Sequence, residues 1–421
     1  MPYIYFYTLG CKLNFTETST LKRIAKENNF DVTIDVTQAD VIVVNTCTVT
    51  QMADKKSRYA IRHVQSKNPN ARIMVTGCYA DTDAESLKQI SGISSIFGNA
   101  EKNYFREWLS SSPISEKKHT SSFFNAYSLG DRTRSFLKVQ DGCNYFCSYC
   151  KVPYARGKSR NASIRELVNE VHEIETHGIK EIVLTGINIG DYGHSTSETF
   201  FKLIQTLEQE TSIERFRISS IEPNLLTDEI IDFVLSSKRF VPHFHIPLQS
   251  GSDEILSAMH RRYSAQLFAD KINYIIKKNK ETGIGIDVIV GFPGETEALF
   301  NETMELLTVL PFSYLHVFEF SERKGTPAAQ LPNKVKDSIK KQRSEQLHKL
   351  SQEKHLLFAE QNIGKIRNVL IERKSKEQRL SGFTDNYIKV SLPYQPETIN
   401  KIIPITLIKW DEDSKTMIGE I

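Results

Sequence analysis

Between residues 135 and 320, short apolar runs alternate with amphipathic helical stretches, and this alternation constrains the fold more than any other sequence feature. Residues 163–178 show the pattern, with Ser163 in the position of a helix cap and Gly178 in that of a helix stop. Six strand–helix units can curve into an open barrel, a shortened relative of the eight-unit version, and an open sheet also satisfies the pattern. The strands are predicted at residues 135–140, 181–186, 215–221, 243–249, 285–291 and 314–320.

The first hundred residues show the same alternation. Buried parallel strands are predicted at residues 3–8, 40–45 and 72–77, and helices at 16–28 and 51–66. This βαβ pattern predicts an α/β domain built on a parallel sheet.

In the last part of the chain, the spacing of apolar residues differs from that of the strand–helix units before it. A long polar helix is predicted over residues 334–362, and short alternating strands follow Gly364. These strands predict a small antiparallel β-barrel. Because 421 residues exceed what one hydrophobic core usually serves, several domains are expected.

We therefore predict a multi-domain α/β protein. Its segments are an N-terminal α/β domain with a parallel sheet (1–110), a linker (111–134), an open (βα)6 barrel (135–355) and a small antiparallel β-barrel (356–421). The linker is predicted because residues 110–122 are polar and show no periodicity.

Composition excludes some classes of protein. No apolar run approaches the length of a membrane span, and the start of the chain lacks a basic signal region, so we expect a cytoplasmic protein with no membrane partner. The net charge is only +3, so a polyanionic partner has to be sought in local clusters. In a reducing cytosol, the six cysteines favour metal or redox chemistry over disulfides.

Three of the cysteines each follow a predicted strand directly. Cys11 follows strand 3–8, Cys47 follows 40–45 and Cys78 follows 72–77. The carboxyl ends of parallel strands are where α/β sheets bind ligands, so these three thiols are expected to converge there. The alternative is that they are small buried core residues, because free cysteine is among the most buried residue types.

The other three cysteines form a CxxxCxxC motif at Cys143, Cys147 and Cys150, after the first strand of the central domain. Zinc needs a fourth ligand, and no His or Cys occurs in the next twelve residues, 151–162. An iron-sulfur cubane held by three cysteines keeps an open position on its fourth iron, where a small molecule with an amine and a carboxylate can chelate. The spacing favours this second kind of site.

These motifs resemble those of the radical S-adenosylmethionine methylthiotransferase family, and the resemblance covers nearly the whole chain. The sequence stretches that carry this resemblance are, in chain order, "TLGCKLN", "VNTCTVT", "TGCYA", "DGCNYFCSYCKVPYARGKSR", "LTGINIGDYG", "RISSIEP", "HIPLQSGSD" and "DVIVGFPGET". Within the family, "GCKLN" and "CTVT" are most similar to the MtaB-type branch, which acts on threonylcarbamoyladenosine next to the tRNA anticodon. Sister branches modify isopentenyladenosine in tRNA or an aspartate of a ribosomal protein.

The resemblance implies two 4Fe-4S clusters. Cys143, Cys147 and Cys150 would hold the cluster that binds and cleaves S-adenosylmethionine, and Cys11, Cys47 and Cys78 would hold an auxiliary cluster for sulfur transfer. The family's reaction replaces the hydrogen on carbon 2 of an adenine with a methylthio group. The implied partners are the tRNA anticodon stem-loop, which a TRAM-like RNA-binding barrel would contact, an electron donor protein and a sulfur source.

Candidate contacts to S-adenosylmethionine lie at the ends of the later strands, where barrel enzymes carry their catalytic groups. They are Tyr149, Thr185, Gly186, Asn188, Ser219, Glu222 and Gln249. For each of them a purely structural role in a loop, turn or cap is an equal alternative. Tyr149 and its aromatic neighbours Tyr145, Phe146 and Tyr154 can stack on a base or on the cofactor adenine, or shield the clusters.

Three basic stretches support an RNA partner. Residues 55–72 hold six Lys or Arg and no acid, residues 151–165 hold five, and residues 366–383 hold five against two acids. In the second stretch, Arg156 suits the cofactor carboxylate as well as an RNA phosphate. A function of another class remains open at this point, an RNA-binding protein whose clusters sense oxygen or iron without catalysis.

Overall fold

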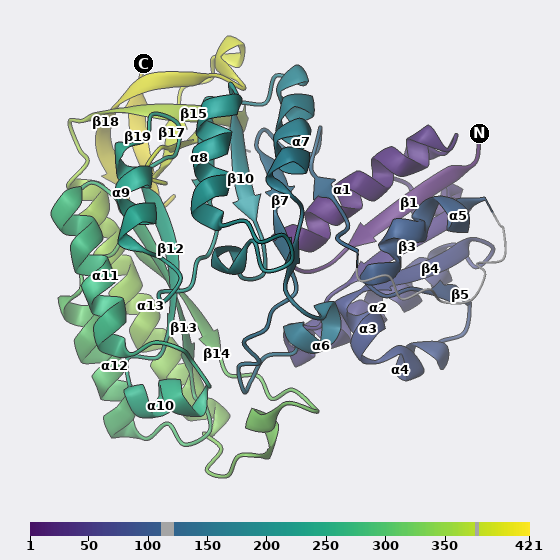
Figure 1. The fold of residues 1–421 in the computed structure, drawn as a ribbon, viewed down its shortest axis with the longest axis horizontal. Helices are drawn as coiled ribbons and strands as arrows, with labels where there is room; N and C mark the ends of the chain where they lie inside the picture. Colours follow the sequence, from purple (N-terminus) through teal and green to yellow (C-terminus); the bar gives the residue numbers. More distant parts are fainter. Residues whose placement is uncertain (111–121, 375–378) are drawn as a thin grey trace.

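The computed structural model describes residues 1–110, 122–374 and 379–421. Its N-terminal part is a parallel sheet with helices on both faces (Figure 1). The strand order is β2-β1-β3-β4-β5. The strands are β1 (Tyr3–Thr8), β2 (Asp31–Thr33), β3 (Val41–Thr46), β4 (Arg72–Gly77) and β5 (Ile93–Ile96). The helices are α1 (Lys12–Glu27), α2 (Gln51–Lys67), α3 (Cys78–Thr82), α4 (Ala84–Lys88) and α5 (Phe105–Leu109).

Helix α1 begins at Lys12, earlier than the predicted start at residue 16. Its first turns bury polar side chains, among them Asn14 and Glu17, so hydrophobic periodicity does not reveal them. Cys11 is consequently the N-cap residue of this helix.

The central part contains the predicted parallel strands in chain order. Strands β7 (Ser135–Lys138), β10 (Glu181–Thr185) and β11 (Arg215–Ile218) form one parallel sheet, and β12 (His243–Gln249), β13 (Gly283–Val290) and β14 (Tyr314–Glu319) form another. The bridges Phe216–Phe240 and Ser220–His245 join the two sheets between β11 and β12. The multi-domain α/β class is therefore confirmed.

Helices cover the outer side of these strands, as Figure 1 shows. They are α7 (Ile164–Thr176), α8 (Phe200–Glu210), α9 (Asp228–Ser236), α10 (Asp253–Ala258), α11 (Ala265–Lys278), α12 (Glu297–Val309) and α13 (Asp337–Glu360). Ser163 caps α7 in a reciprocal capping box with Glu166, and Gly178 follows the helix end with φ of 70°. The cap and stop predicted for this helix are confirmed.

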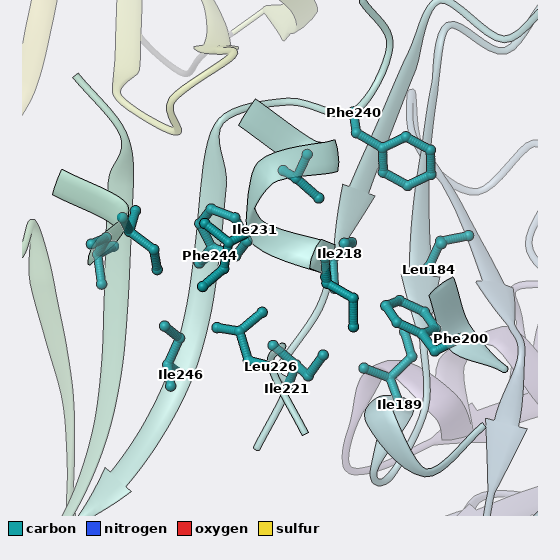
Figure 2. Close-up of a cluster of buried hydrophobic side chains, with 14 of the residues drawn as sticks. Leu184, Ile189, Phe200, Ile218, Ile221, Leu226, Ile231, Phe240, Phe244 and Ile246 are labelled. Atoms are coloured by element: carbon teal, nitrogen blue, oxygen red, sulfur yellow. The ribbon is translucent and has the colours of Figure 1, made fainter. Parts of the chain in front are cut away.

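The core of the central part lies between strands β10 to β12 and their helices (Figure 2). Leu184, Ile218 and Phe244 come from the strands and are at most 3% exposed. Phe200 and Ile231 approach them from α8 and α9. Each such side chain contributes about 1.5–3 kcal/mol by burial, so this core holds the carboxyl ends of the strands, and the loops after them, in fixed positions.

The C-terminal part is a closed barrel of five strands in the order β15-β16-β17-β19-β18. They are β15 (Ile366–Lys374), β16 (Leu380–Thr384), β17 (Lys389–Leu392), β18 (Ile402–Asp411) and β19 (Thr416–Glu420). Four of the neighbouring pairs are antiparallel, as predicted, whereas β17 and β19 pair in parallel. A closed ring with an odd number of strands cannot be antiparallel throughout.

The barrel packs on the amino ends of the central strands. At the start of β11, Arg215 Nη2 donates to Asn368 O at 2.5 Å, and Arg217 Nη1 donates to Asp385 O at 3.1 Å. Glu181 of β10 lies 2.9 Å from Arg217 Nε and neutralises this cationic group inside the interface. The buried Glu181 carboxylate therefore joins the barrel to the central part.

The segment that connects the first two parts is partly ordered. Residues 111–121 of the predicted linker lie outside the described residues, and strand β6 (Ala126–Tyr127) pairs antiparallel with β7. Tyr127 O accepts hydrogen bonds from Arg23 and Thr20 of α1.

The predicted boundary at residues 355/356 falls within α13, and the division into domains stays a prediction. Among the described residues, no helix has the length and apolar character of a membrane span.

Candidate active site at the strand ends

The loop that carries Cys143, Cys147 and Cys150 folds back on the chain that follows helix α6 (Val152–Arg156). Cys143 N donates to Gly157 O at 3.1 Å, directly after strand β8 (Gln140–Asp141). Gly142 has φ of +71°, and a Cβ atom there would lie 2.1 Å from Lys158 O. Only glycine permits this close approach, which sets the position of the first cysteine.

Each sulfur of this motif accepts a hydrogen bond from nitrogen. Tyr145 N lies 3.4 Å from Cys143 Sγ, Val152 N lies 3.4 Å from Cys150 Sγ, and Arg261 Nη1 lies 3.0 Å from Cys147 Sγ. Donors of this kind stabilise thiolates and tune the potential of iron-sulfur clusters.

Burial opposes ionisation of the same three thiols. It raises the pKa of Cys143 to about 11 and that of Cys150 to about 12, and it also raises the pKa of Cys147. Free thiols in this loop are thus protonated at neutral pH. Thiolates would form here when a bound cationic centre compensates their charge.

The structure also brings together the cysteines that follow β1, β3 and β4. Cys11 caps α1, Cys47 follows β3, and Cys78 opens α3. A Cβ on Gly10 would lie 2.9 Å from Cys47 Sγ, so the chain at Cys11 touches the second cysteine. Burial raises the pKa of Cys78 to about 11, Arg156 opposes the shift, and repulsion from Cys11 and Cys47 adds to it.

The sulfurs of the two trios are not gathered as closely as the ligands of one small ion. Among the described residues, the set of three His, Cys, Asp or Glu ligand atoms lying within 4.8 Å of one another is His245, Asp287 and His316. Neither cysteine trio belongs to this set.

A cavity of about 630 Å³ connects the two trios. Cys11 of the first trio and all three cysteines of the CxxxCxxC motif line it, while Cys47 and Cys78 are buried outside its wall. The seven residues proposed from sequence also line it: Tyr149, Thr185, Gly186, Asn188, Ser219, Glu222 and Gln249. Their assignment as S-adenosylmethionine contacts stays a prediction.

Several of these residues have features typical of ligand contacts. The Asn188 amide and the Ser219 hydroxyl are buried and have no hydrogen-bond partner among the described residues. Gln249 adopts the left-handed region with φ of 66° at the end of β12, a strained conformation that is frequent at functional sites. Glu222 pairs with Arg261, the residue that donates to Cys147 Sγ.

Thr185, Gly186 and Tyr149 have evident structural contacts as well. The Thr185 hydroxyl donates to Val183 O at 3.2 Å, and Tyr149 packs against the cluster that contains Met259. A Cβ on Gly186 would lie 3.0 Å from Gln140 Oε1, so glycine permits this close contact.

Sequence patterns missed residues that organise the site. Gln140 Oε1 accepts from Ile187 N and Asn188 N at 3.0 and 2.9 Å, and its Nε2 donates to Gly142 O at 2.8 Å. Gln140 thereby joins the cysteine loop to the loop after β10. The one available signal was a polar residue at the end of an apolar strand.

The structure corrects the role expected for Arg156. Its side chain is fully buried, and it donates to Glu17, Asp141 and Asn14 at 2.9, 2.9 and 2.6 Å. These partners bind both terminal nitrogens of the guanidinium, while its Nε has no hydrogen-bond partner among the described residues. The two carboxylates balance its charge, so neither an RNA phosphate nor the cofactor carboxylate is needed for that purpose. Arg156 instead connects α1 to the strand that precedes the CxxxCxxC motif.

Comparison with known proteins agrees with this geometry. Residues 137–307 match the family described as the Radical SAM superfamily, and residues 3–98 match the one described as Uncharacterized protein family UPF0004. The chain is 37% identical to the threonylcarbamoyladenosine tRNA methylthiotransferase MtaB of Bacillus subtilis, over 97% of this chain and 94% of that relative. The chain belongs to the radical S-adenosylmethionine methylthiotransferase family.

Other similarities place the chain within this methylthiotransferase family and its fold. It is 33% identical to the tRNA-2-methylthio-N(6)-dimethylallyladenosine synthase of Syntrophus aciditrophicus, over 90% of this chain and 85% of that relative. The radical S-adenosylmethionine methyltransferase TsrM of Kitasatospora setae shares its fold, with a TM-score of 0.59, 13% identity and coverage of 78% of this chain and 77% of that chain.

Membership of the methylthiotransferase family implies 4Fe-4S clusters and S-adenosylmethionine, and the site fits these groups. The sulfurs of the CxxxCxxC loop accept N–H donors. The cavity beside them carries unsatisfied polar atoms on Asn188 and Ser219, suited to a polar cofactor. In addition, the positive charge of the Arg261 guanidinium favours a negative charge on the neighbouring Cys147 sulfur.

Proposed function

We propose that this protein replaces the hydrogen on carbon 2 of N6-threonylcarbamoyladenosine, next to the tRNA anticodon, with a methylthio group. The observation that carries the proposal is that one cavity is lined by Cys11 of one trio and by Cys143, Cys147 and Cys150 of the other. A substrate base in this cavity would face both trios at once. The relatives of 33–37% identity over at least 90% of this chain include five threonylcarbamoyladenosine tRNA methylthiotransferases.

The two trios divide the work in this proposal. Cys143, Cys147 and Cys150 hold a 4Fe-4S cluster, and Cys11, Cys47 and Cys78 hold an auxiliary one. When bound, the first cluster supplies the electron for reductive cleavage of S-adenosylmethionine and the second supplies a site for the sulfur to be transferred. Burial of Cys47, Cys78 and Cys147 keeps water away from these three thiols.

Residues around the first cluster orient S-adenosylmethionine. The buried Asn188 amide and Ser219 hydroxyl offer hydrogen bonds to its polar groups. Glu222 and Gln249 lie on the same wall, and Arg261 holds Glu222 in place. Tyr149, Thr185 and Gly186 complete the binding surface.

The RNA is held by exposed basic side chains of helix α2 and by the TRAM-like C-terminal barrel. Helix α2 exposes Lys55, Lys56 and Arg62 beside Tyr59, which is 67% exposed. Cations that contact phosphates, together with an aromatic surface, are typical of proteins that bind an unpaired RNA loop. The reaction then belongs to the cytoplasm, where an electron donor protein and a sulfur source act with it.

Mass spectrometry of tRNA nucleosides tests the proposal, using cells with and without the gene. Loss of 2-methylthio-N6-threonylcarbamoyladenosine alone supports it. Loss of the isopentenyladenosine derivative, or of the modified ribosomal-protein aspartate, would assign the chain to a sister branch. Purified protein that forms no 5′-deoxyadenosine from S-adenosylmethionine under strong reductant would leave only the non-catalytic iron-sulfur sensor.

A further inference from the structure

The cavity has two regions with different charged neighbours. Around Cys147, the electrostatic neighbours are Arg261 and Glu222. Around Lys12, the residue that follows Cys11, they are Tyr387, Arg134, Arg217 and Asp287. The Lys12 region therefore adjoins the region assigned to S-adenosylmethionine, since Asp287 is a charged neighbour of both Lys12 and Glu222, and it borders the C-terminal barrel through Tyr387.

Lys12 differs from the other cations of its region because it has no partner. Arg217 Nε lies 2.9 Å from Glu181 Oε1, and Arg134 Nε lies 2.8 Å from Glu372 Oε1. Asp287 Oδ1 is 2.8 Å from His245 Nε2 and 3.2 Å from His316 Nδ1. Among the described residues, none forms a hydrogen bond or an ion pair with the Lys12 ammonium.

The position of Lys12 makes this free charge available to a ligand. The residue is exposed and lines the cavity, and the two neighbouring arginines already have carboxylate partners. An ammonium without a hydrogen-bond or ion-pair partner is stabilised by an anion that enters the cavity beside it.

Aromatic rings beside Lys12 indicate what else that ligand carries. Tyr314 and Tyr387 have ring centroids 6.1 Å apart, and His316 lies 5.3 Å from Tyr314. All three line the cavity. Such a wall suits a planar nucleobase, so the ligand predicted by this region is a base with an anionic substituent.

We propose that the Lys12 ammonium binds the carboxylate of the threonylcarbamoyl substituent and thereby selects this nucleoside over one with an uncharged N6 substituent. The inference rests on the proposed function and deepens it. A charge-assisted pair of this kind changes affinity by about tenfold or more. Lys12 is thus a specificity-determining residue.

Binding measurements with the full-length, anaerobically reconstituted protein test the role of Lys12. The probes are two anticodon stem-loops of one sequence, with the threonylcarbamoyl group as the free carboxylate or as its methyl ester. The parent protein is expected to prefer the carboxylate by about tenfold. Lys12→Met should abolish the preference without weakening ester binding, and Lys12→Arg should restore part of it. Lys349→Met, on the exposed face of α13, is the matched control.

Three outcomes overturn the inference. A carboxylate preference that survives in Lys12→Met would show that another group reads the substituent. If Lys12→Met weakened the binding of both stem-loops equally, Lys12 would be assigned to a backbone phosphate. A raised KM for S-adenosylmethionine in RNA-free 5′-deoxyadenosine formation would assign it to the cofactor carboxylate. Failure of the parent to methylthiolate the carboxylate stem-loop would instead refute the proposed function.

Discussion

Arg156 and Glu17, 139 residues apart in sequence, form a fully buried ion pair in which Nη1 lies 2.9 Å from Oε1. Glu17 lies on α1, the helix that Cys11 caps, and Arg156 also binds Asp141, which precedes the CxxxCxxC motif. Lys102 and Lys138 bind the same Glu17 carboxylate. This network fixes the two cysteine-bearing parts of the chain relative to each other.

Glu17→Gln is expected to destabilise the fold by about 3–5 kcal/mol, because it leaves three buried cations without their shared partner. Glu27→Gln, on the same helix, removes a pair with Arg106 whose side chains are 62% and 56% exposed, and should cost at most about 1 kcal/mol. Urea unfolding of the two variants measures the difference. Equal stability losses would show that the buried network contributes no more than a surface pair.

Alanine substitutions in the two cysteine trios are expected to abolish different activities. Alanine at Cys143, Cys147 or Cys150 should abolish 5′-deoxyadenosine formation, because no cluster is left to bind S-adenosylmethionine. Alanine at Cys11, Cys47 or Cys78 should preserve cofactor cleavage and abolish methylthiolation. Both products are measured by chromatography after anaerobic reconstitution, and identical behaviour of the two sets would contradict the division of labour.

Gly77 is expected to be required for the first trio. It has φ of +97° directly before Cys78, and a Cβ there would lie 2.5 Å from Asn45 Oδ1 and from Thr46 O. Gly77→Ala should therefore displace Cys78 and lower the iron content, while cofactor cleavage continues. Gly130→Ala is the control, since its φ is +76° but no heavy atom lies within 4 Å of the added Cβ. Its cost should be about 1–2 kcal/mol with full iron content.

Glu170 on α7 is expected to make the protein less stable as pH rises. Burial and the nearby Glu166 raise its pKa to about 8, and its Oε2 has no hydrogen-bond partner among the described residues. The folded protein keeps the proton between pH 4.5 and 8 while the unfolded chain has lost it, so stability falls through this range.

Glu170→Gln removes this titration. The variant should match the parent near pH 4.5 and melt a few degrees above it at pH 8. Thermal unfolding across this range measures the effect, and Glu305→Gln on the exposed face of α12 serves as a comparison. A melting difference that does not change with pH would rule out the titration of Glu170 as its cause.

Much of the fold was predictable because the decisive patterns are local. The strand-to-cysteine spacing placed Cys11, Cys47 and Cys78 after neighbouring parallel strands, and the Ser163 cap fixed the start of α7. The start of α1 was missed because Asn14 and Glu17 are buried polar residues, whose partners lie in distant segments. The parallel pair of β17 and β19 follows from closing five strands, which local alternation does not show.

The sequence by itself determined the strand–helix units, the two sets of three cysteines and the family. Tertiary structure alone decided that Arg156 belongs to a buried ion network, that Gln140 joins two loops, and that Lys12 reaches a cavity without a counter-ion. The physical reason is that apolar periodicity and motif spacing report which face of an element is buried. The partner of a charged side chain depends on which segments, far apart in sequence, pack together in space.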